Sequence, residues 1–209
     1  MKLILVSQRV SIEPSYKERR DCLDQRWSLL LEKAGLIGVM MPNNINAVQV
    51  LLQNINPNGL LLTGGNSLTK YDGDAPERDK AEVFALKYAI KKNIPVLGVC
   101  RGMQLIQDYF GVELEKIKGH VATRIELSHE SGKFGSLYKK LSNVNAYHNL
   151  GTKYTSDSLK VSAKSSRGVV MAIEHSEKNI YGCMWHPERE EPINDIDIDH
   201  IKNIFGVNL

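Results

Sequence analysis

One stretch near the middle of the chain most constrains its fold: Pro95-Val-Leu-Gly-Val-Cys-Arg-Gly-Met-Gln-Leu105. The apolar run Val96–Val99 predicts a buried strand, and the helix-forming residues from Met103 onward predict a helix directly after it. Cys100 lies in the glycine-flanked turn between them, where a strand-turn-helix hairpin exposes a nucleophile at a sheet edge. The alternative is a core cysteine, because free cysteine is among the most buried residue types.

A second segment, Gly182-Cys-Met-Trp-His-Pro-Glu188, follows another apolar run. A nucleophilic cysteine needs a base within hydrogen-bond reach, and that base needs a third group to fix its tautomer. The turn at Pro187 could place the Glu188 carboxylate against the His186 imidazole. We therefore expect Cys100, His186 and Glu188 to meet as nucleophile, base and orienting acid. A surface His-Pro-Glu turn is the alternative interpretation.

A third segment, Asn58-Gly-Leu-Leu-Leu-Thr-Gly-Gly65, is an apolar strand that ends in paired glycines. Such glycines can turn a backbone N–H group toward a developing oxyanion. We predict that the backbone N–H groups of Gly65 and Arg101 form the oxyanion hole. An ordinary strand-to-loop turn would leave the same pattern.

Apolar runs alternate with helical patterns along the first half of the chain. The runs are Leu3–Val6, Leu36–Met41, Gly59–Leu62 and Val96–Val99, and the helical patterns are Tyr16–Ala34, Ala47–Gln53 and Glu77–Lys92. This order predicts an α/β fold with a mostly parallel central sheet flanked by helices. The segment from Glu113 to Tyr181 predicts a small antiparallel extension, and Ile193–Phe205 predicts a closing helix. Without linker composition or repeats, we expect residues 1–209 to form a single domain.

The composition favours a cytoplasmic enzyme. The chain has no apolar run long enough to span a bilayer, and its start is too soon polar for a signal peptide. An odd count of three cysteines predicts reduced thiols. No His/Cys cluster has the spacing of zinc ligands, so we expect neither a metal nor another cofactor. The net charge of +3 is too small to argue for a nucleic-acid partner.

Four motifs, LLLTGG, GVCRGMQ, VNAYHN and WHPE, stand in an order and spacing that resemble the class I glutamine amidotransferase family. Within it, the chain is similar to the stand-alone γ-glutamyl hydrolases. The resemblance implies a flavodoxin-like sheet and a Cys-His-Glu triad that cleaves a γ-glutamyl amide through a thioester, releasing L-glutamate. By position, it also implies a glutamyl-binding role for Gln104 and for a segment that contains Asn145, Ala146, Tyr147 and His148.

The loop after the first strand is rich in basic residues. Ligands of open α/β sheets bind beyond the carboxyl ends of the strands, and this loop is one such place. Forked guanidinium groups of Arg9, Arg19 and Arg20 could bind an anionic leaving group such as a phosphate. The alternative is a solvated helix face with i,i+4 ion pairs.

The identity of the leaving group stays open at this point. The resemblance favours a γ-glutamyl conjugate of a nucleotide diphosphate, with γ-glutamyl-γ-aminobutyrate as an alternative. The chain could instead be a glutaminase component that supplies ammonia to a separate synthetase, although an arginine directly after the cysteine is unusual in that branch. A catalytically silent binding module is disfavoured because Cys100, His186 and Glu188 are all present.

Overall fold

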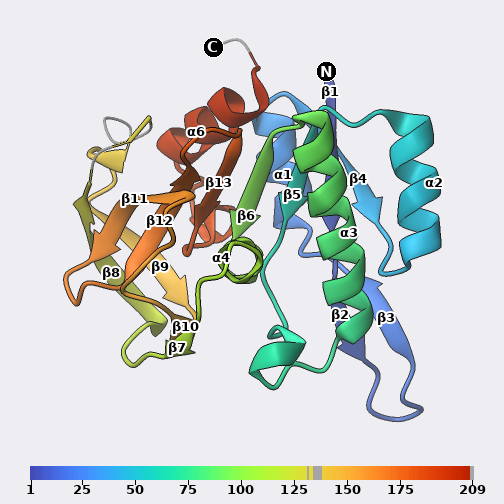
Figure 1. Ribbon diagram of the computed structural model, residues 1–209, viewed down its shortest axis with the longest axis horizontal. Coiled ribbons are helices and arrows are strands. Elements are labelled where there is room, and N and C mark those ends of the chain that lie inside the picture. The colour runs from blue at the N-terminus through green and yellow to red at the C-terminus, as the bar shows by residue number, and fades with distance from the viewer. Residues whose placement is uncertain (131, 134–137, 208–209) are drawn as a thin grey trace.

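The computed structural model describes residues 1–130, 132–133 and 138–207. The strands are β1 (Lys2–Ser7), β2 (Arg9–Ile12), β3 (Arg19–Cys22), β4 (Leu36–Met41), β5 (Gly59–Leu62), β6 (Val96–Val99), β7 (Glu115–Lys116), β8 (Val121–His129), β9 (Asn143–Tyr147), β10 (Leu150–Gly151), β11 (Leu159–Ser165), β12 (Val170–His175) and β13 (Ile180–Cys183). Nine of them form one sheet in the order β4-β1-β5-β6-β13-β12-β11-β8-β9 (Figure 1). The first five in this order are parallel, and the others continue the sheet antiparallel. The predicted parallel sheet with an antiparallel extension is confirmed.

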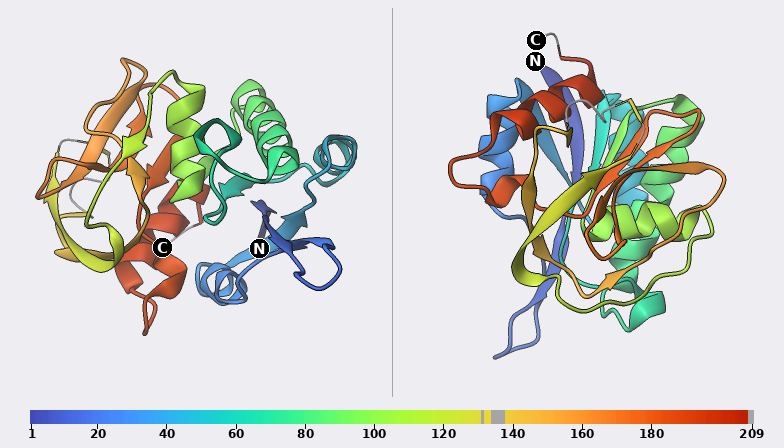
Figure 2. Two further views of the ribbon diagram at one scale, coloured as in Figure 1. Left: turned by 90° about the horizontal axis from the view of Figure 1, so that it is seen from below. Right: turned by 90° about the vertical axis from the view of Figure 1, so that its left-hand side faces the viewer.

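Helices cover both faces of the parallel strands. They are α1 (Arg26–Lys33), α2 (Ile45–Ile55), α3 (Pro76–Lys92), α4 (Arg101–Tyr109) and α6 (Asp195–Phe205), with short 3-10 turns η1 (Thr69–Tyr71) and η2 (Pro187–Arg189). α1 and α6 lie on one face and α3 and α4 on the other (Figure 2). A strand between two helical layers is buried on both sides, which explains why β5 and β6 are continuous apolar runs. The predicted closing helix is confirmed as α6.

The helix predicted over Tyr16–Ala34 is wrong in its first half. β3 lies within that range and pairs with the preceding β2 as an antiparallel hairpin, and α1 begins only at Arg26. Lys17 adopts a φ of +57° in the turn, which ends any helix. The charged residues that suggested a helix face are instead the exposed side chains of a two-stranded ribbon that projects beyond the sheet (Figure 1).

The strand order places a crevice at the carboxyl ends of the strands. β1 pairs with β4 on one side and with β5 on the other, so the direction of winding reverses between β1 and β5. Ligands of open α/β sheets bind at such a switch point. β13 lies parallel to β6, with Cys183 opposite Val99. The residues that follow these two strands, Cys100 and Met184, are therefore brought together at the same edge.

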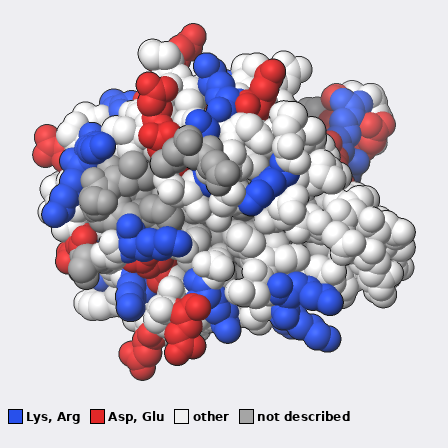
Figure 3. Space-filling view, turned by 90° about the horizontal axis from the view of Figure 1, so that it is seen from above, with Lys and Arg blue, Asp and Glu red and all other residues white. Residues whose placement is uncertain are grey.

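The opposite end of the molecule, where the strands begin, carries basic and acidic side chains interspersed over its surface (Figure 3). This mixture is typical of a solvated face. None of the described helices is long and apolar enough to cross a membrane.

Asp197 on α6 is a buried acid beneath the site, and its Oδ1 accepts a hydrogen bond of 3.0 Å from Trp185 Nε1. Burial raises the pKa of Asp197 to about 7. The negative charges of Glu190 and Glu188 also raise this pKa, whereas the hydrogen bond from Trp185 lowers it. The folded protein therefore binds a proton that the unfolded chain has lost between pH 3.8 and about 7. Stability contributed by this group falls as the pH rises through that window.

Asp197→Asn should stabilise the protein at pH 8, because asparagine keeps the Oδ1 acceptor without a buried charge. We expect Tm to rise by about 5 °C at pH 8, and the gain to shrink toward pH 4. Calorimetry at the two pH values checks this, with exposed Asp195→Asn on the same helix as the control. A variant that is no more stable than the wild type at pH 8 would contradict the charge penalty.

Candidate active site

Cys100 occupies a strained turn between β6 and α4. Its φ of +53° and ψ of −107° lie outside the regions that L-residues favour. Its N–H donates to the Cys183 carbonyl at 2.8 Å, and its carbonyl accepts from Gln104 N at 3.0 Å. The side chain is 7 % exposed. The strand-turn-helix predicted from the sequence is present, with Cys100 at its apex.

Glycine at position 102 is what allows this turn to lie against the sheet. A Cβ atom on Gly102 would come within 2.0 Å of the Leu62 carbonyl oxygen. Any larger residue would force the start of α4 away from β5. The close approach keeps Cys100 beside the loop that follows β5.

His186 and Glu188 follow β13 and lie buried beside the thiol. His186 Nδ1 is 2.7 Å from Glu188 Oε1, and Cys100 lies next to the imidazole. Burial would lower the pKa of His186, but the interactions with Cys100 and Glu188 outweigh this effect and raise the pKa to about 9. Gly64 lets the ring pack against its loop, because a Cβ there would lie 2.5 Å from His186 Cε1. The imidazole can therefore carry a proton at neutral pH.

Asn145 holds the backbone of His186. Its Oδ1 accepts from His186 N at 2.9 Å, and its Nδ2 donates to the His186 carbonyl at 2.8 Å. Ala146 is fully buried in β9. Neither residue lines the cavities described below. Both amide atoms of Asn145 are thus used to hold the backbone of His186.

A cavity of about 230 Å³, here called the thiol-side cavity, opens beside Cys100. It is lined by Gly65, Asn66, Ser67, Cys100, Arg101, Gln104, Tyr147, His148, Asn149, Leu150, His186 and Arg189. Both predicted oxyanion donors therefore border the same space as the thiol. Gln104 Nε2 donates to the Leu150 carbonyl at 3.1 Å, and His148 Nδ1 lies 3.1 Å from the same oxygen. Burial lowers the pKa of His148 to about 4, so its imidazole is neutral at physiological pH.

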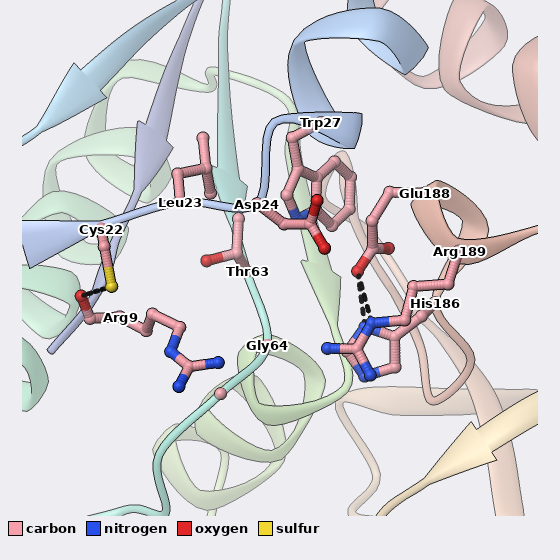
Figure 4. A pocket seen from close by; sticks show the side chains of 11 residues that line it. Arg9, Cys22, Leu23, Asp24, Trp27, Thr63, Gly64, His186, Glu188 and Arg189 are labelled. Carbon is pink, nitrogen blue, oxygen red and sulfur yellow. Dashed lines mark hydrogen bonds and ion pairs between the residues drawn. The ribbon is translucent and has the colours of Figure 1, made fainter. Parts of the chain in front are cut away.

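A second cavity of about 270 Å³, here called the arginine cavity, is also lined by His186 (Figure 4). It is lined by Arg9, Cys22, Leu23, Asp24, Trp27, Thr63, Gly64, Gly65, His186, Glu188 and Arg189. The guanidinium groups of Arg9 and Arg189 extend toward it from opposite sides (Figure 4). Both cavities share Gly65, His186 and Arg189, so a molecule bound at Cys100 could occupy both.

Of the three arginines predicted to contact the leaving group, only Arg9 lines a cavity of the site. Arg19 Nε donates to Glu77 at 2.7 Å, and Arg20 Nη2 donates to the Tyr16 hydroxyl at 2.6 Å. Arg20 and Arg19 pair with Ser11 and Ile12 nearer the turn of the hairpin, whereas Arg9 pairs with Cys22 at its base, beside the cavity. Arg189, which sequence reasoning missed, lies 4.8 Å over the Tyr147 ring. Its position directly after Glu188 was the one signal available.

The Arg101 side chain takes part in a buried ion-pair cluster. It is 1 % exposed and pairs with Glu82 and Asp79. The side chain is thus held by nearby acids, while the backbone of Arg101 begins α4 directly after Cys100. Within the described residues, no group of three or more His, Cys, Asp or Glu side chains is arranged to hold a metal.

Three known proteins match this chain over most of their own length. A γ-glutamyl-CDP-amidate hydrolase from Campylobacter jejuni is 30% identical over 92% of this chain and 93% of its own. A glutamine-hydrolysing GMP synthase subunit from Methanosphaera stadtmanae is 28% identical over 79% of this chain and 82% of its own. The crystal structure of a candidate GMP synthase subunit from Thermoplasma acidophilum superimposes with a TM-score of 0.71 at 23% identity, covering 99% of this chain and 94% of that one. The Peptidase C26 family profile matches residues 3–188, so the chain belongs to this class I glutamine amidotransferase-like family.

Proposed function

We propose that this protein hydrolyses γ-glutamyl-CDP-amidate to L-glutamate and cytidine diphosphoramidate, in the modification of capsular polysaccharide. Hydrolysis of a γ-glutamyl amide bond follows from the Peptidase C26 family and the full-length similarity to the C. jejuni hydrolase. The observation that carries the chemistry is the placement of His186 between the Cys100 thiol and Glu188, where two cavities meet.

Acylation requires a sulfur nucleophile and a proton for the departing nitrogen. Cys100 sulfur attacks the γ-carbonyl carbon, while backbone N–H groups of Gly65 and Arg101 stabilise the oxyanion. The His186 imidazolium donates its proton to the amide nitrogen, and the C–N bond breaks. The products of this half-reaction are the γ-glutamyl thioester on Cys100 and the free phosphoramidate.

Deacylation returns the enzyme to its starting state. Neutral His186 accepts a proton from water, and the water oxygen attacks the thioester carbon. The C–S bond breaks, the sulfur leaves as thiolate beside the imidazolium, and L-glutamate is released. Glu188 keeps the imidazole in one tautomer during both proton transfers.

The arginine cavity supports an anionic leaving group. Its acids already have partners, because Asp24 pairs with Arg26 at 2.7 Å and Glu188 with His186 at 2.7 Å. None of the described residues hydrogen-bonds the exposed Arg9 guanidinium. An unpaired guanidinium group matches the oxygens of a diphosphate in charge and in fork geometry. Ammonia, the leaving group of glutamine, would gain nothing from it.

Arg9→Gln should selectively weaken turnover of γ-glutamyl-CDP-amidate. Loss of a charge-assisted hydrogen bond costs about 1.5–3 kcal/mol, so we expect KM for this substrate to rise about 10- to 100-fold. KM for glutamine, which has an uncharged leaving group, should change little. Steady-state glutamate release checks both values.

Arg20→Gln is the matched control because it removes the same charge from the hairpin without touching the cavity. Its KM for the nucleotide conjugate should stay near the wild-type value at physiological salt. An Arg9→Gln variant with an unchanged KM would contradict diphosphate binding in the arginine cavity.

A second candidate is a glutaminase component of a two-chain synthetase, favoured by the similarity to the M. stadtmanae GMP synthase subunit. A panel of glutamine, γ-glutamyl-γ-aminobutyrate, a γ-glutamyl peptide and γ-glutamyl-CDP-amidate separates the possibilities. Fast glutamate release from the nucleotide conjugate alone would support the proposal. Turnover of glutamine only after a synthetase is added would replace it with the glutaminase, and selective turnover of γ-glutamyl-γ-aminobutyrate would replace the substrate.

A further inference from the structure

Arg78, on the first turn of α3, is a fully buried arginine next to the site. Its guanidinium donates to three consecutive backbone carbonyls, those of Thr63 at 2.7 Å, Gly64 at 3.0 Å and Gly65 at 2.6 Å. We propose that Arg78 is a positioning residue that orients the oxyanion hole, an inference that rests on the thioester chemistry proposed above.

The planarity of the peptide bond carries this argument. In a trans peptide the C=O and N–H groups point in opposite directions. The Gly64 carbonyl faces Arg78, so the Gly65 N–H in the same peptide plane must point away from Arg78. Gly65 borders the thiol-side cavity together with Cys100. By holding one carbonyl, Arg78 therefore aims the predicted oxyanion donor into the cavity.

The hydrogen bond to Gly64 also affects the strength of that donor. Hydrogen-bonded groups in a chain polarise one another. A guanidinium on the carbonyl side withdraws electron density from the peptide and makes its N–H a stronger donor. The effect acts only where negative charge develops, so it stabilises the tetrahedral state more than the bound substrate.

A buried ion-pair cluster connects Arg78 to Arg101, the residue of the second predicted oxyanion donor. Glu82 accepts from Arg78 Nε at 2.8 Å through one oxygen and from Arg101 through the other. Asp79 pairs with Arg101 as well, so two cations face two anions. Burial lowers the pKa of Arg78 to about 10, although the negative charge of Glu82 opposes this shift. The guanidinium is therefore still charged at neutral pH. One cluster thus holds the backbone of Gly65 and the side chain of Arg101.

Packing alone does not explain a charged residue in this place. A buried ion pair is often no more stabilising than apolar residues of similar volume. Three successive carbonyls on one side chain do require a planar group with several donors, which only arginine offers. The buried charge of Arg78 instead serves to fix the loop beside the nucleophile.

Arg78→Lys tests the proposal because lysine keeps the charge but cannot span three carbonyls. We expect kcat with the best γ-glutamyl substrate to fall about 100-fold, near the cost of losing one oxyanion donor, while KM changes by less than about threefold. Alkylation of Cys100 by iodoacetamide should keep its wild-type rate. That reaction needs the thiol and His186, but it takes place at a saturated carbon and forms no oxyanion.

Leu86→Ala, which opens a buried cavity beneath the same helix, is the control for destabilisation alone. It should lower Tm without lowering kcat when both variants are assayed well below their own Tm. Arg78→Gln, which keeps an amide donor but no charge, provides a second variant and should lose at least as much kcat as Arg78→Lys. A kcat within about threefold of the wild type in either folded variant would overturn the proposal.

The outcome for wild-type protein separates this inference from the proposed function. A wild type that turns over the panel, with Arg78 variants that match it, refutes only the positioning role. A wild type inert toward every γ-glutamyl compound refutes the proposed function, and the positioning role with it. A parallel loss of kcat and alkylation rate would show a disturbed thiol rather than a misaligned oxyanion hole, and would also overturn the inference.

Discussion

Cys100→Ala should abolish turnover of every γ-glutamyl substrate, with kcat falling by about 10⁴- to 10⁶-fold. Without the sulfur no thioester can form, and His186 has no nucleophile to deprotonate. The strained backbone at φ +53° is part of the sheet-to-helix connection and should remain, because its hydrogen bonds involve main-chain atoms. Glutamate release by the purified variant, measured beside the wild type, gives the result.

Trapping the intermediate makes this test specific for the thioester. Hydroxylamine should convert the wild-type acyl-enzyme to γ-glutamyl hydroxamate, and Cys100→Ala should yield none. Cys183→Ser is the matched control, since the thiol of this second buried cysteine donates to the Trp185 carbonyl. Residual activity of Cys100→Ala above about one-hundredth of wild type would rule out covalent catalysis at this position.

Glu188→Gln should lower kcat about 10³- to 10⁴-fold while leaving the protein folded. Glutamine keeps the size of the side chain but can present its amide to His186 Nδ1, which stabilises the wrong tautomer. The carboxylate also helps raise the pKa of His186 to about 9. Without the carboxylate the pKa of His186 falls. The imidazolium that protonates the leaving nitrogen is then lost at a lower pH than in the wild type.

The pH profile therefore distinguishes Glu188 from a structural acid. The high-pH limb of kcat should move toward neutrality in Glu188→Gln, because the protonated imidazole is lost earlier. The same linkage applies to stability: the contribution of His186 is complete below pH 6.5 and is lost as the pH rises through about 9. Exposed Glu191→Gln removes an equal charge nearby and should shift neither limb. An unshifted limb in Glu188→Gln would contradict the proposed coupling.

The parts of the fold with strong local signals could be predicted from the sequence. The strands before Cys100 and before Gly64 are short apolar runs that end in glycine-rich turns, and both are present at the expected places. Parallel strands bring their carboxyl ends to one edge, so the meeting of Cys100 with His186 followed from topology. Bringing the segments of Cys100 and His186 to one edge required no more than the correct strand order.

The hairpin and the arginines were harder because their pattern was ambiguous. A run of exposed charged residues fits a solvated helix and a two-stranded ribbon equally well, since neither buries an apolar face. Arg19 and Arg20 have side chains suited to anion binding, but they do not line either cavity of the site. Arg78 and Glu82 had helical i,i+4 spacing, which predicts a surface ion pair. Their burial depends on the close approach of α3 to the loop after β5, which no local pattern records.

The register of β13 beside β6 has a consequence for the newly made chain. Cys100 and the strand before it are synthesised well before β13, the strand that delivers the base. Pairing of such distant segments must pay the entropy of closing a long loop, so it forms late. The growing polypeptide thus holds Cys100 without His186 until β13 has been made. Nucleophile and base meet only when β13 pairs with β6, so we expect the site to assemble late in folding.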